Sequence, residues 1–206
     1  MDSCPVTDSR SALLAAAAEE FAKHGRQGTR LQSIVRRAGV NERMIYHHFG
    51  SKDGLYAAVL EAQLTALAEQ WRPVVDTASQ LEPYDAMRMI LTGFLDILTG
   101  RPLMLALWLH EALAGWTTMP PPTVEMLPGE VREVYERGQR AGVFRADCPF
   151  EVAYATAMCA LFALPVIGPR FASILDTSAP TGPARLRDQV VGQLIDGMTT
   201  GGPSAR

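Results

Sequence analysis

The sequence predicts an all-α protein with an N-terminal head and a larger helical body. Apolar residues recur at helical spacing along most of the 206 residues, and no segment alternates apolar and polar residues as a half-buried strand does. Basic charge is concentrated near the N-terminus, while the rest of the chain is acidic. These observations predict a head over residues 1–56 and a body over residues 57–206 with an apolar core.

The head is expected to contain three helices, of which the first covers residues 9–24. Strong helix formers fill this segment, and its apolar stripe stops at Gly25. The second helix is expected to begin after Thr29 as its N-cap and to end at Gly39 as its C-cap. Its apolar residues share one helix face, and they are Leu31, Ile34, Val35 and Ala38. Because two short helices bury too little apolar surface, we expect the first helix to pack across the other two.

The third helix is expected after a connection of only four residues, 38–41. Asn41 is a good N-cap, and Val40 is placed to close on Ile45 as a hydrophobic staple. A connection this short that contains a glycine is typical of a helix-turn-helix DNA-binding unit. The inward face of the third helix is expected to comprise Met44, Ile45, His48 and Phe49. The opposite face carries Arg43, Tyr46, His47 and Gly50.

Residues 21–52 carry most of the positive charge of the head. Seven basic residues stand against Glu42 alone, which gives a net charge of +6 in a chain whose net charge is −3. Divided after Tyr56, the chain has a net charge of +2 on the N-terminal side and −5 on the other. A basic run by itself is equally typical of a solvated helix face, but together with the helix spacing it predicts an anion-binding head on an acidic body.

Duplex DNA is the anion that such a head fits best. Arg43 lies near the start of the third helix and is expected to reach a base edge, most readily that of guanine. Lys52 would begin the next helix, where the helix dipole disfavours a cation, so a nearby phosphate would explain its position. Phosphate contacts are expected from Thr29, Tyr46, His47 and Lys52. The full set of expected DNA contacts is Thr29, Arg30, Asn41, Arg43, Tyr46, His47 and Lys52.

Several short motifs of the head resemble the N-terminal signature of the tetracycline-repressor (TetR) family of bacterial regulators. The resemblance covers residues 9–56 in order and without gaps. The matching motifs are Phe21–Gly25, Gly28–Thr29, Ile34, Ala38–Val40 and Tyr46–Leu55. Val35 stands where the family usually has Ala, and Asn41 where it usually has Ser or Thr. Both departures are physically mild, since Asn caps a helix as well as Ser does.

The body is expected to begin with a long helix that connects it to the head. This helix is capped by Ser51 and extends from Lys52 to about Arg72, which makes a rod of about 30 Å at ~1.5 Å per residue. Further helices are expected over residues 87–98, 102–116, 130–141, 150–168 and 186–198. The segment 102–116 is apolar on nearly all sides, so it should be buried.

Residues 152–168 form an uncharged run at the lower edge of the length that spans a membrane. Thr156, Pro165 and the missing basic flank favour instead a buried helix at a dimer interface. The resemblance implies the same arrangement, because the last two long helices of TetR proteins pair with their symmetry mates in a four-helix bundle. Residues 150–168 and 184–198 would then form that bundle, and no membrane contact is expected.

No catalytic, metal or cofactor site is expected, so the protein should not be an enzyme. His110 and Glu111 match the start of a zinc-protease motif, but Ala114 stands where the second histidine would be. The three cysteines are odd in number and show no C-x-x-C spacing, which indicates neither a disulfide framework nor a zinc site. Residues 1–10 are polar and lack the pattern of an export signal, so we expect a cytoplasmic protein.

A candidate pocket for a small hydrophobic effector lies in the body. Large apolar residues and a few polar ones occur on helices that are expected to converge, and they are Met104, Trp108, His110, Glu111, Trp116 and Tyr135. The alternative is that each is an ordinary core residue, which is the commoner case for a Met or Trp on a buried helix. The resemblance implies an effector pocket in this domain but does not name its residues.

Together these features predict a ligand-responsive transcriptional repressor. A single short reading helix contacts few bases, so we expect a homodimer on a palindromic operator of double-stranded DNA, with half-sites ~34 Å or a multiple apart. Effector binding would be passed to the head through the long helix that begins at Lys52. The alternative is a helical small-molecule-binding or enzyme-like protein whose basic head serves an acidic partner other than DNA. A steep salt dependence of DNA affinity would distinguish the first from the second.

Overall fold

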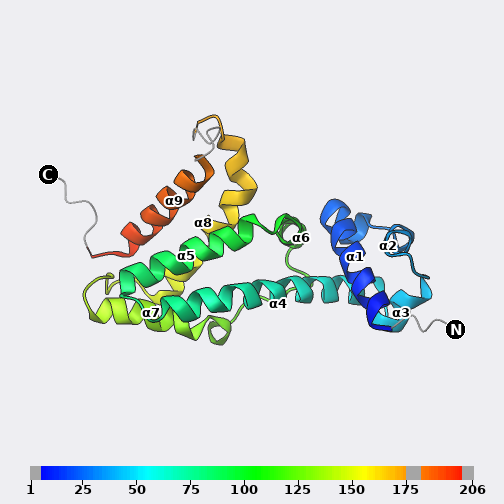
Figure 1. The fold of residues 1–206 in the computed structure, drawn as a ribbon, viewed down its shortest axis with the longest axis horizontal. Helices are drawn as coiled ribbons and strands as arrows, with labels where there is room; N and C mark the ends of the chain where they lie inside the picture. The colour runs from blue at the N-terminus through cyan, green and yellow to red at the C-terminus, as the bar shows by residue number, and fades with distance from the viewer. Residues whose placement is uncertain (1–5, 175–181, 201–206) are drawn as a thin grey trace. The chain divides into compact units, whose positions relative to one another are not determined.

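The computed structural model describes residues 6–174 and 182–200, and within these ranges it confirms an all-α fold (Figure 1). One isolated bridge, between Phe144 and Thr199, is the only β pairing in the described part of the chain. The α-helices are α1 (Val6–Gly28), α2 (Leu31–Ala38), α3 (Arg43–Phe49), α4 (Lys52–Ala78), α5 (Pro83–Thr99), α6 (Pro102–Leu113), α7 (Gly129–Arg140), α8 (Phe150–Ile167) and α9 (Gly182–Met198). Two short 3₁₀ helices, η1 (Val124–Met126) and η2 (Gly168–Phe171), complete the order.

The chain divides into two compact units, and both are discontinuous in sequence. The first contains the residues up to Leu67 together with Arg101–Pro121, and the second contains Ala68–Gly100 together with the residues from Pro122 onward. Helix α6 therefore belongs to the same unit as α1, α2 and α3. The expected boundary at residue 56 separates a DNA-binding head from an effector-binding body, and it does not coincide with a boundary of the two compact units. This functional boundary stays a prediction.

The core of the first unit confirms the three-helix head and adds α6 to it. Its fully buried side chains come from α1 to α4 and α6, and they include Leu13, Phe21, Ile34, Ile45, Leu55 and Leu107. The ring of Tyr56 meets the ring of Phe21 edge to face, with centroids 4.9 Å apart. The apolar faces of the short helices α2 and α3 thus pack against one continuous apolar core, as the helical spacing of their apolar residues requires.

Helix α4 continues past Pro73 to Ala78, so the expected end near Arg72 was wrong. A proline removes one backbone hydrogen bond, but packing of the following turn can offset that loss. Val75 and Ala78 are buried. Gly93 of α5 has no Cβ, so the side chain of Val74 on α4 packs closely against the α5 backbone. Tertiary packing therefore overrides the local stop signal.

Helix α6 is shorter and more exposed than its uniformly apolar sequence predicts. It ends at Leu113, because Gly115 and Trp116 adopt positive φ values of 77° and 60° that turn the chain. Met104 and Leu107 are buried, whereas Leu113 is 79% exposed. The expected full burial of residues 102–116 was wrong, since only one face of α6 packs within its unit.

The second unit is built around α5. Residues of α5 at helical spacing are buried against α7, α8 and α9, and they include Met87, Ile90, Leu91, Phe94, Leu95 and Leu98. The guanidinium of Arg137 on α7 donates hydrogen bonds to the carbonyls of Ser79 and Leu81, which follow the C-terminus of α4. This cation satisfies carbonyls that the helix end leaves without partners.

Helix α8 presents an uncharged outer face. The stretch Phe150–Phe171 is long and apolar enough to cross a membrane by length and composition alone, and 22% of its most apolar window is buried. Val152, Thr156 and Cys159 lie on the exposed side at spacings of three and four residues. An exposed apolar face on a helix that buries few of its residues favours a contact surface.

Candidate nucleic-acid interface

The turn between α2 and α3 follows the expected geometry. Helix α2 ends at Gly39, whose φ of 67° lies in the left-handed region that favours glycine. The N–H of Val40 donates to the carbonyl of Val35 over 3.1 Å. The residue that directly precedes α3 is Glu42, one position later than the expected cap at Asn41, and it makes no side-chain cap. The Oδ1 of Asn41 nevertheless accepts the N–H of Arg43 over 2.9 Å, so Asn41 closes the turn that leads into α3.

Helix α3 places its two faces as the sequence predicts. Ile45 is fully buried and Met44, His48 and Phe49 are half-buried, whereas Arg43, Tyr46 and His47 are exposed. The ring of His48 is hydrogen-bonded to the Oγ of Ser9 at 3.0 Å, which ties α3 to α1. The outward face of α3 is therefore free to offer a guanidinium, a phenol and an imidazole to a ligand.

Thr29 plays a different role from the expected one. The residue that precedes α2 is Arg30, and it makes no side-chain cap. Thr29 is buried, and its hydroxyl lies 2.7 Å from the carbonyl of Gly25 and 3.0 Å from that of Glu20. The expected N-cap at Thr29 was therefore wrong, because its hydroxyl is hydrogen-bonded to backbone carbonyls of α1 and not to a backbone N–H of α2. Because its hydroxyl proton is used within the head, Thr29 has none to donate to a phosphate.

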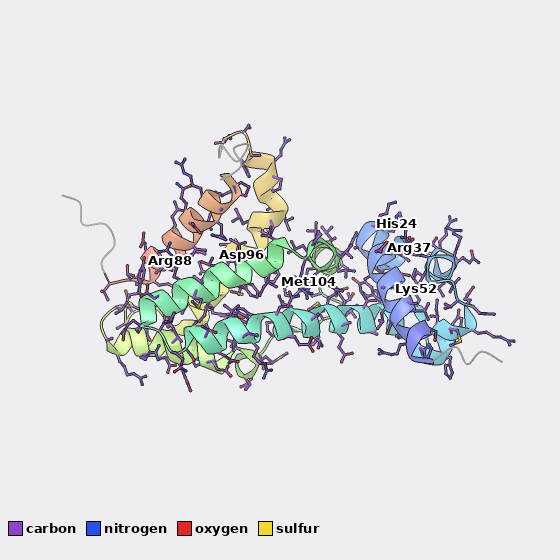
Figure 2. The ribbon with its side chains drawn as sticks, in the orientation of Figure 1. His24, Arg37, Lys52, Arg88, Asp96 and Met104 are labelled. Atoms are coloured by element: carbon purple, nitrogen blue, oxygen red, sulfur yellow. The ribbon has the colours of Figure 1, made fainter. Side chains whose placement is uncertain are left out.

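Lys52 lies half-buried at the first position of α4 (Figure 2). Its ammonium donates to the carbonyls of Thr29 and, at 3.4 Å, of Gln27. These carbonyls lie at the C-terminal end of α1, where a helix dipole favours a cation. This contact supplies a structural reason for a lysine at the start of α4, and one of its three N–H donors is left for a phosphate. The Oγ of Ser51 accepts the N–H of Gly54 at 3.0 Å, which confirms the expected cap.

The arginines and lysine from Arg26 to Lys52 fall into two groups. Arg37 is paired with Glu19 at 2.6 Å and with Glu20 at 3.2 Å, and Arg26 lies 3.3 Å from Asp53. Arg30, Arg36 and Arg43 are exposed, and among the described residues no acidic side chain forms an ion pair with them. These three guanidinium groups and the Lys52 ammonium leave positive charge that a polyanion can neutralise.

Gly54 is a residue of this region that the sequence motifs contain but whose role sequence reasoning missed. A Cβ at this position would lie 2.0 Å from the carbonyl oxygen of Phe49. Only glycine therefore permits α4 to start so close to the end of α3. The signal was present as a glycine in the first turn of a helix, where it weakens the helix unless close packing requires it.

Five of the six expected pocket residues lie on or after α6 in the first unit. His110 Nε2 is hydrogen-bonded to the carbonyl of Ala22 at 3.1 Å. Glu111 is 1% exposed and accepts the N–H groups of Thr118 and Met119. Met104 is fully buried, and the rings of Trp108 and Trp116 meet edge to face with centroids 5.9 Å apart. Tyr135 belongs to the second unit.

A buried carboxylate next to a buried phenol is the most perturbed electrostatic feature of the first unit. Burial and the neighbouring Glu111 carboxylate raise the pKa of Tyr56 well above its usual value, and Arg26 opposes this effect. Tyr56 therefore stays neutral at physiological pH and can donate a hydrogen bond. Among residues 6–174 and 182–200, no group of three or more His, Cys, Asp or Glu side chains is placed to hold a metal ion.

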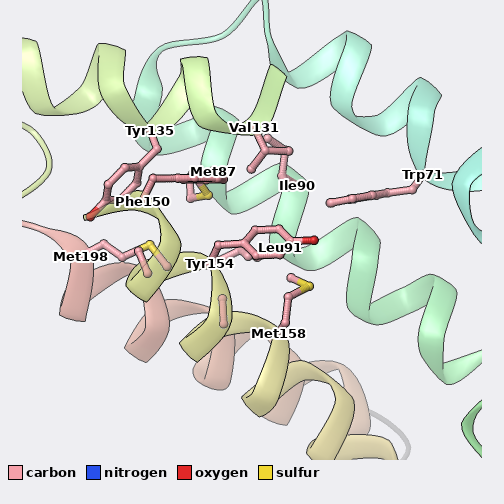
Figure 3. Close-up of a pocket in the computed structure, with 12 residues that line it drawn as sticks. Trp71, Met87, Ile90, Leu91, Val131, Tyr135, Phe150, Tyr154, Met158 and Met198 are labelled. Atoms are coloured by element: carbon pink, nitrogen blue, oxygen red, sulfur yellow. The ribbon is translucent and has the colours of Figure 1, made fainter. Parts of the chain in front are cut away.

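The described part of the second unit contains a small, partly enclosed cavity of about 10 Å³ (Figure 3). It is lined by residues of α4, α5, α7, α8 and α9, and Tyr135 is the one expected pocket residue among them. The hydroxyl of Tyr135 donates to the carbonyl of Cys148 at 3.1 Å. Trp71 of α4 also lines this cavity.

Comparisons with known proteins agree with this geometry. The family model described as "Bacterial regulatory proteins, tetR family" matches residues 13–59. The HTH-type transcriptional repressor NicS of Pseudomonas putida is 31% identical over 151 residues, which are 70% of each chain. The HTH-type transcriptional repressor SCO4008 of Streptomyces coelicolor is 28% identical over 184 residues, which are 88% of this chain and 90% of that protein. The solved structure of SCO4942 from Streptomyces coelicolor superposes with a TM-score of 0.68 at 25% identity, covering 92% and 98% of the two chains.

Proposed function

We propose a repressor function for this chain, which belongs to the tetR family of bacterial regulatory proteins and is a DNA-binding transcriptional regulator. The repressor is cytoplasmic, and it releases its operator when a small apolar molecule binds the body. The observation that carries the proposal is the outward face of α3, where Arg43, Tyr46 and His47 are exposed beside unpaired basic residues. A short helix with such a face fits the major groove of DNA, where side chains reach base edges.

The proposed contacts divide into base and phosphate contacts. Arg43 stands at the N-terminus of α3 and is assigned to a base edge, with guanine as the best bidentate acceptor. Phosphate contacts are assigned to Arg30, Arg36, Tyr46, His47 and Lys52. Contacts with phosphates fix the orientation of the protein on DNA but carry no sequence information. Asn41 uses its side-chain oxygen to accept the N–H of Arg43, so its amide nitrogen is the group that can donate to a phosphate.

A homodimer is part of the proposal. The exposed side of α8 is apolar or small and uncharged, and the resemblance implied a four-helix bundle made by α8, α9 and their symmetry mates. A twofold axis through this face presents two copies of α3 to a palindromic operator with half-sites ~34 Å or a multiple apart. Introduction of a charge at Val152 would place an unpaired charge in that interface.

Coupling between effector and DNA is proposed to use α4. This helix begins at Lys52, next to the carbonyls that close α1, and ends in the second unit, where Trp71 lines the cavity. An effector shifts the equilibrium only if it binds one arrangement of the dimer better than the other. Release of the operator therefore requires that the arrangement of the dimer that binds the effector differ from the arrangement that binds DNA.

The experiment that tests the proposal is selection of binding sites from random duplex DNA with the full chain. The expected result is enrichment of one palindromic site, and binding to it that weakens steeply with salt. The Lys52→Ala variant should weaken binding to all sequences alike, because phosphate contacts do not read bases. Absence of any enriched site would refute the assignment of α3 to base readout.

A further inference from the structure

Helix α6 belongs to the same compact unit as α2 and α3, and it packs against α1 (Figure 1). Its only ionisable residues are His110 and Glu111, which are adjacent and lie near its C-terminal end. Polar side chains on an otherwise apolar helix are costly to bury unless they make hydrogen bonds, so their partners indicate their role. These partners lie on α1, on α4 and in the loop that follows α6.

His110 is hydrogen-bonded to α1 next to the kink of that helix. Its Nε2 lies 3.1 Å from the carbonyl oxygen of Ala22. A carbonyl oxygen can only accept, so Nε2 carries the proton and donates it. The same ring packs on Gly25, where a Cβ would lie 3.0 Å from Nδ1. Gly25 has a φ of 67°, which turns the end of α1 out of its helical path, and His110 supports this kink from one side.

The kink is connected to the proposed phosphate contact at Lys52 by a short series of hydrogen bonds. The carbonyl of Gly25 accepts the hydroxyl of Thr29 at 2.7 Å and its N–H at 3.2 Å. The carbonyl of Thr29 in turn accepts the ammonium of Lys52, which Figure 2 labels at the start of α4. The stem of a lysine is flexible, so the position of its ammonium depends on where that carbonyl lies. A displacement of the kink would therefore move the Lys52 ammonium.

Glu111 holds α6 against α4. Its buried carboxylate accepts the hydroxyl of Tyr56, which lies on α4 one helical turn after Lys52. It also accepts the N–H groups of Thr118 at 3.0 Å and Met119 at 3.3 Å. These donors compensate for the burial of the carboxylate. Helix α6 is thus hydrogen-bonded to α1 and to α4, the two helices that place Lys52.

We propose that His110 is a positioning residue for DNA binding, which keeps the Lys52 ammonium in place for a phosphate by fixing the kink of α1. Glu111 supports this role by holding α6 on α4. The inference rests on the proposed function, because it takes Lys52 as a phosphate contact. The alternative is the role expected from the sequence, in which His110 anchors an effector and does not affect DNA binding when no effector is present.

The test is a double-mutant cycle of His110 and Lys52, measured as the salt dependence of affinity for the operator selected from random DNA, with no effector added. His110→Leu removes the donor and keeps a side chain of similar size. It should flatten the slope of log K against log salt by about 2, because one phosphate contact is lost in each protomer. In the Lys52→Ala background the same substitution should leave the slope unchanged and the affinity within about twofold.

Two further variants separate positioning from packing. His110→Gln should keep the parent slope, since its amide Nε2 can donate to the Ala22 carbonyl from a similar position. Leu113→Ala is the matched control on α6, because Leu113 is exposed, and it should also keep the parent slope. A His110→Leu slope equal to that of the parent, or an equal loss of affinity in the parent and Lys52→Ala backgrounds, would overturn the proposal.

Hydrogen exchange of the full chain without DNA gives an independent measurement. In His110→Leu the amide of Thr29, which donates to Gly25, should exchange about tenfold faster, as expected for loss of one buried hydrogen bond. The amide of Val59, in the core of the same unit, should keep its parent rate. Equal acceleration at Thr29 and Val59 would show a loss of stability of the whole unit and would refute the positioning role.

Failure of this proposal is distinguishable from failure of the proposed function. A parent chain that bound no duplex would refute the proposed function and, with it, the phosphate contact of Lys52. The exchange of the Thr29 amide would still show whether His110 fixes the kink. A parent chain that bound its operator, with independent effects of His110→Leu and Lys52→Ala, would refute the positioning role alone.

Discussion

The number of unpaired cations in the head predicts how steeply DNA affinity falls with salt. Arg30 and Arg36 are exposed and form no ion pair with any acidic side chain that the structure describes, and the Lys52 ammonium donates to backbone carbonyls. Arg26 and Arg37 are paired with carboxylates. With Arg43 assigned to a base, three of the cations between Arg26 and Lys52 remain for phosphates in each protomer, and they are Arg30, Arg36 and Lys52. A dimer then neutralises about six phosphates, and the slope of log K against log salt should be about −5.

This slope corresponds to a large and measurable loss of affinity. Between 50 and 200 mM salt the affinity for the selected operator should fall roughly a thousandfold. Fluorescence anisotropy with a labelled duplex measures the affinity at each salt concentration. Because the slope depends on released counterions, it reports the number of phosphate contacts independently of the base contacts.

A pair of variants connects the slope to particular side chains. Arg30→Ala removes one cation from each protomer and should flatten the slope by about 2. Arg140→Ala removes an equal charge from α7 in the second unit and should leave the slope unchanged. A parent slope flatter than about −2, or equal slopes for the two variants, would refute the assignment of phosphates to the head.

Three further variants test other parts of the account. Arg43→Ala should relax the preference at one base position of each half-site, at a cost of roughly 1 to 3 kcal/mol measured with a panel of operator variants. Gly138→Ala should lower the free energy of unfolding in urea by about 1 to 3 kcal/mol, because its Cβ would lie 2.1 Å from the buried Phe144 ring. Gly197→Ala should instead be neutral or stabilising by up to about 1 kcal/mol, because outside its own turn of α9 no described atom lies within 4 Å of the new Cβ. Val152→Glu should shift the protein toward monomer in sedimentation velocity, and a mass unchanged from the parent would contradict the α8 interface.

Local signals made the head predictable. The apolar stripe of α2, the left-handed Gly39 and the Asn41 side-chain hydrogen bond each act within four residues, so periodicity and capping rules were sufficient. The helix-turn-helix and the exposed face of α3 followed from them. Thr29 was misassigned because its hydroxyl bonds to Glu20, nine residues earlier, across the kink in α1.

Features that depend on distant residues could not be predicted. Helix α4 passes Pro73 because α5 packs on its last turns, and α6 joins the first unit because His110 contacts Ala22, 88 residues earlier. Trp71 is one of several apolar residues along α4, and nothing in its sequence neighbourhood sets it apart. Its role in the cavity appears only once α5, α7 and α8 are in place, since no local pattern distinguishes a cavity wall from an ordinary core residue.

The molar mass of the complex on the selected site tests the central claim most directly. Sedimentation equilibrium with the palindromic duplex should give two chains for each duplex. A duplex that carries one half-site should bind far more weakly, because one copy of α3 contacts too few bases. One chain for each duplex, with equal affinity for the half-site and the full site, would contradict the account.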